Sequence, residues 1–179
     1  FEAPLAGKVL TLGHELAILA YIERKCPAVA GADEREWAVS QRFGHQAEDV
    51  YKALVAKQPT LYETDKVSKE ALAEWWAGDD RTLHNRKQGL QVHLGLLEAA
   101  AAATPGKEGY LTLNGKSVGE CKLWATLHML VMIKSDVLAP FPALTAFYER
   151  FGGEAATKRV VDSGGRFPGA LKQYFVAAE

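Results

Sequence analysis

Apolar residues recur along this chain at the three- and four-residue spacing of amphipathic helices. Between residues 33 and 57 they stand at Phe43, Ala47, Val50 and Leu54, with charged residues on the other face. This spacing predicts a long helix that buries one face, and the acidic run at its start is expected to be solvated. The same pattern, bounded by proline or glycine, predicts shorter helices over residues 16–25, 68–76, 83–103, 142–151 and 154–162.

Residues 123–133 differ from the other segments because they are apolar almost all round. A helix without a polar face is predicted to run through the middle of a bundle. Its start fits a capping box, in which the Ser117 hydroxyl and the Glu120 carboxylate each accept a hydrogen bond from a backbone N–H. We assign these two residues a structural role, because a cap of this kind stabilises a helix wherever it starts.

The first 26 residues do not continue the helical pattern. Residues 1–9 are expected to be extended and are broken by Pro4 and Gly7, and Pro27 ends the helix that follows. The expected fold class is therefore mostly α, with an all-helical domain over residues 33–179 preceded by a strand and helix fragment over residues 1–26. The apolar tail at residues 167–176 is expected to dock on the helical domain.

Composition narrows the possible partners. The chain has 179 residues, of which 48% are hydrophobic, and 21 Lys and Arg nearly balance 22 Asp and Glu for a net charge of -1. Such a chain offers no basic surface for a nucleic-acid backbone or an anionic membrane. No apolar run approaches the ~20 residues of a membrane span. We therefore expect no nucleic-acid partner and no membrane insertion.

The cysteines and histidines indicate neither a disulfide framework nor a metal site. Cys26 and Cys121 are far apart in the sequence, and the five histidines show no metal-ligand spacing. This usage favours a reducing compartment, either the cytoplasm or the interior of an organelle. Packing is the expected role of Cys121, because it lies in the first turn of the apolar helix.

Several motifs occur in the order in which one family carries them. They are Ala-Pro-Leu, Gly-Lys-Val-Leu, Leu-Ala-Ile-Leu-Ala-Tyr-Ile, an apolar helix opened by Ser-x-x-acid, and Phe-Pro-Ala-Leu-x-Ala-Phe-Tyr-Glu-Arg. Together they resemble the soluble glutathione transferase superfamily, and within it the sigma-like members. The resemblance covers nearly the whole chain. It implies that residues 1–26 are the end of an incomplete thioredoxin-like domain, and that the family's catalytic Tyr, Ser or Cys lies outside these 179 residues.

The resemblance also implies the remains of a glutathione site. Pro4 matches the family's cis-proline, and Leu5 would offer its backbone to the cysteinyl part of glutathione. His14 and Glu15 stand where the family usually has Gln-Ser or Glu-Ser, which hold the γ-glutamyl carboxylate. A glutamate at the second of these positions would repel that carboxylate. Asp49 matches an acidic run on the long helix that reaches the partner subunit's glutathione.

Two functions remain open at this stage. One is a non-catalytic, glutathione transferase-like structural or interaction module, present as a homodimer or in a larger assembly, with weak or absent glutathione binding. The other is a fragment of an active transferase that conjugates or isomerises electrophiles with glutathione. An unrelated helical bundle would not explain the ordered motifs. Tyr51, Trp75 and Trp76 are candidates for an apolar substrate pocket, although aromatic residues at this spacing more often belong to a core.

Overall fold

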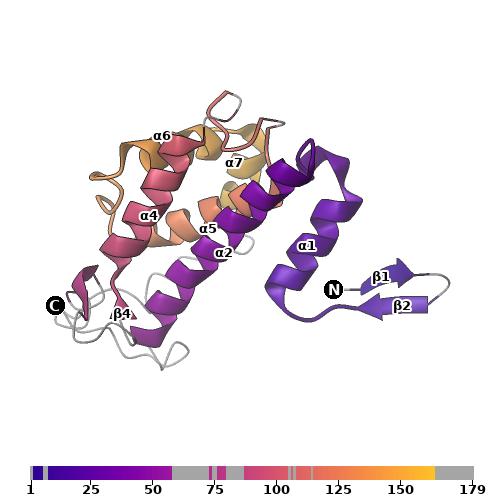
Figure 1. The fold of residues 1–179 in the computed structure, drawn as a ribbon, viewed down its shortest axis with the longest axis horizontal. Coiled ribbons are helices and arrows are strands. Elements are labelled where there is room, and N and C mark those ends of the chain that lie inside the picture. The colour runs from indigo at the N-terminus through magenta and orange to yellow at the C-terminus, as the bar shows by residue number, and fades with distance from the viewer. Residues whose placement is uncertain are drawn as a thin grey trace.

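The computed structural model describes residues 2–5, 8–57, 73, 76–79, 87–104, 106, 108–113 and 115–163. These residues form a mostly helical fold, as the sequence predicts (Figure 1). Its α-helices are α1 (Glu15–Lys25), α2 (Glu34–Lys57), α4 (Leu90–Ala103), α5 (Val118–Ile133), α6 (Pro142–Gly152) and α7 (Ala155–Asp162), and a short 3₁₀ turn, η1, covers Pro27–Val29. The strands form two antiparallel pairs, β1 (Glu2–Leu5) with β2 (Lys8–Thr11) and β3 (Gly78–Asp79) with β4 (Lys87–Gln88).

The centre of the bundle is α5. Leu123, Leu127 and Leu130 of this helix are buried, and none of its residues is exposed. Helices α2 and α6 pack against it, and α4 packs against α2 and α6. These three helices contribute to the core Phe43, Leu54, Leu94, Leu97, Leu144 and Phe147. The prediction of a central apolar helix is confirmed, and a partly exposed C-terminal turn at residues 131–133 marks the limit of its burial.

α2 and α5 approach each other closely at Gly119. A Cβ atom on this residue would lie 1.8 Å from the carbonyl oxygen of Ser40, which is far inside contact distance. The Ser40 hydroxyl accepts a hydrogen bond from the Gly119 N–H at 3.0 Å. Glycine is therefore required at this position, because the α2 backbone at Ser40 occupies the space that a side chain would need.

The predicted capping box at the start of α5 is present. The Ser117 hydroxyl accepts from the Glu120 N–H at 3.3 Å, and the Glu120 carboxylate accepts from the Ser117 N–H at 2.8 Å. Glu120 is fully buried and also accepts from the Thr112 hydroxyl at 3.0 Å and from the Leu111 N–H. The structural role of both cap residues is confirmed, and Glu120 additionally fixes the segment that precedes the helix.

The expected solvated run at the start of α2 is confirmed at residues 33–35, which are exposed, and is wrong at Glu36, which is buried. Asp33 is exposed and caps the helix by accepting from the Glu36 N–H at 2.9 Å. Glu36 is only 7% exposed, and its carboxylate accepts from the Ala32 N–H at 2.6 Å and from the Leu113 N–H. Burial of Glu36 follows from these bonds, since its two acceptor oxygens serve backbone groups from two segments.

The helix predicted over residues 83–103 starts later than expected. Lys87 and Gln88 form β4, and the helix begins at Leu90 after an extended Gly89. The apolar spacing continues through Gly89, although the backbone of this residue is extended and not helical. Hydrophobic periodicity alone therefore predicts a start of this helix that is too early. Apart from residues 73 and 76, the helix predicted over residues 68–76 lies outside the described residues, as does the tail at residues 167–176.

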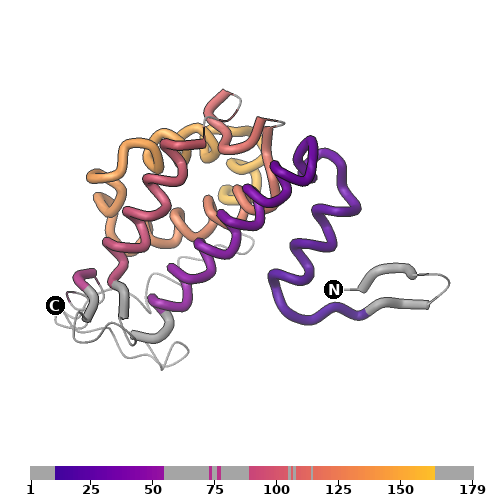
Figure 2. The backbone as a smooth tube through the Cα atoms, viewed as in Figure 1, coloured from indigo at the N-terminus to yellow at the C-terminus, as the bar shows by residue number. Residues whose placement is uncertain are grey.

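α1 lies at one side of the bundle, where it packs against both α2 and α5, and the chain reaches it through the β1–β2 hairpin (Figures 1 and 2). The backbone trace shows α2 as the element between α1 and α4 (Figure 2). The expected extended segment at the chain start is confirmed and is paired as a hairpin. In the part of the chain that is described, no helix combines the length and the hydropathy that a membrane crossing requires.

Candidate functional site

The start of α1 meets α2 and α5 at one lysine. The Nζ atom of Lys122 lies 2.7 Å from Oε1 of Glu15 and 3.0 Å from Oε2 of Glu48. It also lies 5.4 Å from the centre of the Tyr51 ring. The Lys122 side chain is 8% exposed, whereas the Glu15 side chain is 55% exposed. The structure thus brings the predicted residues Glu15 and Tyr51 to a lysine that sequence reasoning did not single out. We call Glu15, Glu48 and Lys122 the ion-pair cluster.

Two opposed effects set the charge of Lys122. Burial lowers its pKa, because the ammonium loses water, but the hydrogen bonds and negative charges of Glu15 and Glu48 outweigh this and raise the pKa above its ordinary value. The lysine is therefore an ammonium at neutral pH. Glu48 also pairs with Lys52, whose ammonium lies 3.8 Å from its Oε1, so two carboxylates face two ammonium groups here. The buried Lys122 ammonium is already paired with two carboxylates.

Glu15 occupies the anion position of a helix start. It is the first residue of α1, and His14 before it is exposed, has a φ of 67° and makes no side-chain cap. A helix N-terminus favours a negative charge, and here the Glu15 carboxylate lies in that first turn while pairing with Lys122.

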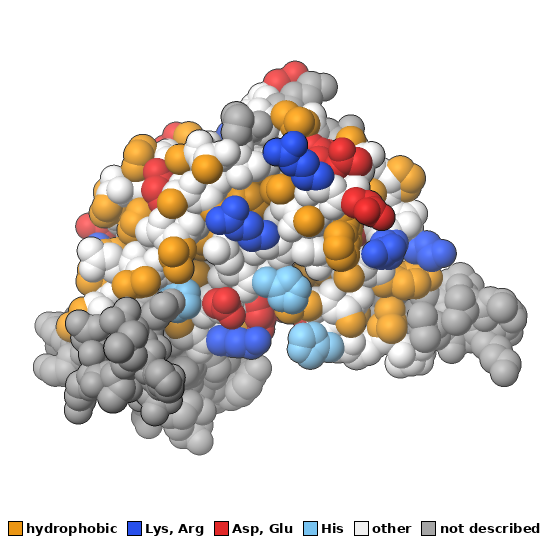
Figure 3. Space-filling view, in the orientation of Figure 1, with side chains coloured by type: hydrophobic (Ala, Val, Ile, Leu, Met, Phe, Trp, Pro, Cys, Tyr) orange, Lys and Arg blue, Asp and Glu red, His pale blue; other side chains and the backbone are white. Residues whose placement is uncertain are grey.

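Asp49 does not join the ion-pair cluster. It is exposed on α2, and its charge acts on His93 of α4, where burial is the larger effect and leaves the histidine pKa below its ordinary value. Figure 3 shows histidine, acidic and basic side chains close together on the face in view. Among the described residues, Lys122 pairs with Glu15 and Glu48 and not with Asp49.

Of the remaining predicted site residues, none whose side chain is described joins the ion-pair cluster. Trp76 packs against the core, with the Lys134 ammonium 6.0 Å from its ring, and Trp75 lies outside the described residues. Pro4 and Leu5 lie in β1, whose side chains are outside the description. The described residues contain no cis peptide bond, so the cis bond that the resemblance implies before Pro4 is not found among them.

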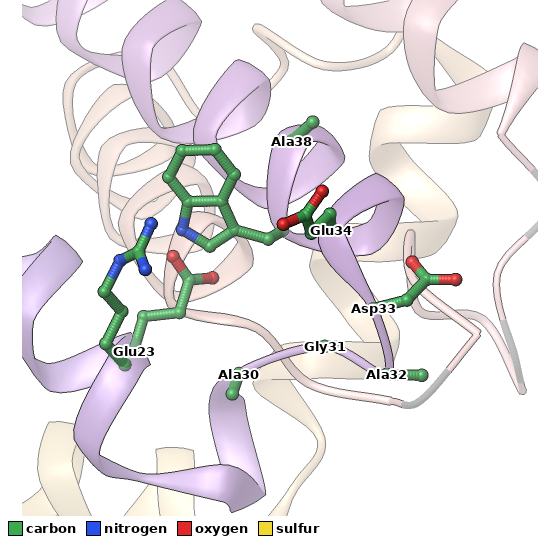
Figure 4. Close-up of a pocket in the computed structure, with 9 residues that line it drawn as sticks. Glu23, Ala30, Gly31, Ala32, Asp33, Glu34 and Ala38 are labelled. Atoms are coloured by element: carbon green, nitrogen blue, oxygen red, sulfur yellow. The ribbon is translucent and has the colours of Figure 1, made fainter.

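A cavity of about 480 Å³ lies where the end of α1, the turn at residues 30–32 and the start of α2 meet. In Figure 4, Glu23 extends from α1 toward α2. Glu23 is fully buried, and its carboxylate accepts from the Ser40 hydroxyl and from Nε2 of Gln41, the latter at 2.6 Å. Because Ser40 in turn accepts from the Gly119 N–H, Glu23 joins α1 to α2 and α5, and none of its surface is left for a ligand.

The large apolar side chains of α1 are only partly covered by the bundle. Glu23 is the buried residue of this helix, whereas Leu16, Ile18, Leu19, Tyr21 and Ile22 are all partly exposed. Leu16 and Leu19 face α2 and α5 around a small cleft, and Ile18 and Ile22 stand one turn apart on another side of the helix. α1 therefore carries apolar surface on more than one side.

The described residues offer little for metal or thiol chemistry. They contain no group of three or more His, Cys, Asp or Glu that could hold a metal ion. Burial raises the pKa of the Cys121 thiol to about 11, so it stays protonated and weakly nucleophilic at neutral pH. A scan of the chain against protein-family models found no match, and a search of curated proteins found none.

Proposed function

We propose that this chain is a glutathione transferase-like protein that acts as a structural or interaction module rather than as a catalyst. The order of its elements supports the likeness: a hairpin, a short helix, a long helix, a capped apolar helix and a helix opened by Pro142. The ion-pair cluster carries the non-catalytic part of the proposal. In the resembling family, the start of the short helix receives the γ-glutamyl carboxylate of glutathione, and here Glu15 occupies that place.

Repulsion between carboxylates weakens glutathione binding at the start of α1. A glutathione carboxylate ~4 Å from the Glu15 carboxylate would be repelled by roughly 1 kcal/mol in water and about 4 kcal/mol at an effective dielectric of 20. Lys122 does not offset this repulsion, because its ammonium is already bonded to Glu15 and Glu48. A binding energy of about 4 kcal/mol corresponds to a Kd of only ~1 mM, so a repulsion of this size removes much of it.

Calorimetry with glutathione tests this part of the proposal. We expect the unmodified chain to bind more weakly than ~1 mM, and Glu15→Ser to bind measurably tighter because it removes the competing carboxylate and frees one bond of Lys122. Glu34→Ser is the matched control, since Glu34 is the exposed first residue of α2 as Glu15 is of α1. Micromolar binding by the unmodified chain would contradict the proposal.

The partly exposed apolar side chains of α1 support the interaction role. A helix that shows apolar surface on more than one side gains stability when a partner covers it. We expect the chain to associate with a second copy through α1, and Ile18→Asn with Ile22→Asn to weaken that association in sedimentation velocity. Val160→Asn on α7 is the control, because Val160 is also apolar and 52% exposed. A concentration-independent monomer would contradict a homodimer through this helix.

One observation favours the alternative of an active transferase fragment. Lys122 of α5 has a raised pKa, and its ammonium lies beside Glu15, the first residue of α1. An ammonium is therefore present close to where the resembling family binds a carboxylate. If Glu15, which is 55% exposed, turned outward, this ammonium would pair with glutathione instead. Turnover of an electrophile with glutathione by the unmodified chain would establish that alternative.

A further inference from the structure

α5, α6 and α7 line a cavity of about 260 Å³, open to solvent, that takes no part in the function proposed above. α5 lines it with Trp124 and His128, which stand one turn apart, and α6 lines it with Tyr148 and Gly152, also one turn apart. The other lining residues are Glu149, Lys158, Val161 and Asp162. Side chains from three helices therefore converge on one hollow, as they do in small-molecule sites.

Aromatic rings form the wall of this cavity in nearly parallel planes. The Trp124 ring lies 4.7 Å from the His128 ring at an interplanar angle of 12°, and 5.9 Å from the Tyr148 ring at 10°. The indole is fixed, because its Nε1 donates to the Tyr148 carbonyl oxygen at 3.1 Å. A Cβ on Gly152 would lie 3.3 Å from that nitrogen, so the glycine allows α6 to approach the indole closely.

A hydrogen-bonded pair lies within the aromatic wall. Nδ1 of His128 is 2.9 Å from the Tyr148 hydroxyl oxygen. Burial lowers the pKa of His128 and raises the pKa of Tyr148, so both rings are uncharged at neutral pH. A tyrosine hydroxyl both donates and accepts, and one bond to His128 therefore leaves it able to make another.

The rim of the cavity carries both signs of charge. Lys158, Glu149 and Asp162 are exposed, and no ion pair among the described residues joins them. A mixed rim around a neutral wall selects neither an anion nor a cation. The cavity therefore matches a flat ligand with one polar group. The aromatic rings suit a planar molecule, and the Tyr148 hydroxyl can make one further hydrogen bond.

We propose that this cavity binds a small, uncharged, planar aromatic molecule that carries one hydrogen-bonding group. Trp124 is only 5% exposed, so the ligand ring lies against the partly exposed rings of His128 and Tyr148, which stack on the indole. The polar group of the ligand bonds to the Tyr148 hydroxyl. The inference does not depend on glutathione or on α1, because it involves residues of α5, α6 and α7 alone.

The probe for this site is 2-naphthol, and the matched probe is decahydro-2-naphthol, which keeps the hydroxyl and loses the aromatic plane. We follow the indole N–H resonance of Trp124, assigned with Trp124→Phe, and measure Kd by calorimetry. The resonance is expected to shift saturably with 2-naphthol and not with the saturated alcohol. An unmoved Trp124 resonance at millimolar 2-naphthol, or equal binding of both probes, would overturn the proposal.

Tyr148→Phe tests the hydroxyl and leaves the ring in place. We expect roughly five- to tenfold weaker binding of 2-naphthol, the net effect of one hydrogen bond, whereas Tyr21→Phe on α1 leaves Kd unchanged. Equal effects of the two variants would overturn the proposal. Circular dichroism checks folding, and if Tyr148→Phe does not fold, Val161→Phe replaces it. This variant puts a ring into the cavity from α7 and is expected to abolish binding, so retained binding contradicts the site.

Discussion

At the scale of single residues, the interactions that the sequence predicts are the local ones. Ser117 and Glu120 are three positions apart, and their mutual bonds form within one helical turn. Lys122 could not be found in this way, because its partner Glu15 is 107 positions away in the chain. Lys122 follows the capping box in the sequence, where nothing marks it as buried. Its burial depends on two carboxylates that the fold brings to it.

Leu127 tests the predicted centre of the bundle. It is fully buried on α5, so Leu127→Ala leaves a cavity and is expected to lower the free energy of unfolding by about 2 to 5 kcal/mol. Chemical denaturation measures this loss. Leu96→Ala on α4 is the control, because Leu96 is 49% exposed and its truncation is expected to change stability by less than about 0.5 kcal/mol. Equal losses in both variants would show that α5 is not the core helix.

At the scale of whole elements, periodicity predicted which segments are helical better than where they begin. α2 and α1 begin within one residue of their predicted starts, because Asp33 and His14 lie just before a change in apolar pattern. α4 begins seven positions after Leu83, the expected first residue, since the apolar spacing continues through Gly89. Turn geometry and strand pairing, which leave little trace in hydrophobic spacing, decide such starts.

The two helix glycines with contrasting surroundings give a matched test of the α2–α5 contact. Gly119→Ala places a methyl group 1.8 Å from the Ser40 carbonyl oxygen, so we expect the helices to separate and the melting temperature to fall sharply. Gly95→Ala on α4 meets nothing within 4 Å and is expected to stabilise the protein by about 1 kcal/mol through helix propensity. Thermal unfolding followed by circular dichroism compares them. A neutral Gly119→Ala would mean that the helices are farther apart than described.

At the scale of the molecule, the sequence predicted one helical body and could not predict what faces its surfaces. The pattern of Leu16, Ile18, Leu19 and Ile22 predicted a helix, and the structure shows that this helix is only partly covered. Which side of a helix is covered depends on tertiary packing, and the apolar residues of α1 do not form one stripe that would indicate it. The cavity at α5, α6 and α7 was missed for the same reason, since its residues come from three segments.

Stability is expected to fall on acidification below pH 6.5. Burial holds the pKa values of His93 and His128 below 6.5, so the folded state binds their protons less readily than the unfolded state does. Their contribution is present above pH 6.5 and is lost as the pH falls toward the lowered values. Denaturation midpoints at pH 7 and pH 5 measure the loss, and His128→Gln is expected to reduce it. His45→Gln, at an exposed position, is expected to leave it unchanged.

The two buried helix-start glutamates have a consequence for how the backbone exchanges hydrogen with solvent. Glu120 of α5 accepts from the Leu111 amide, and Glu36 of α2 accepts from the Leu113 amide, although the Leu113 side chain is 66% exposed. These amides belong to an irregular segment outside the helices and strands, and amides in such segments ordinarily exchange readily through local opening. Because their acceptors are buried in the first turns of two core helices, they should exchange only when α2 and α5 come apart, and their protection should match that of the core.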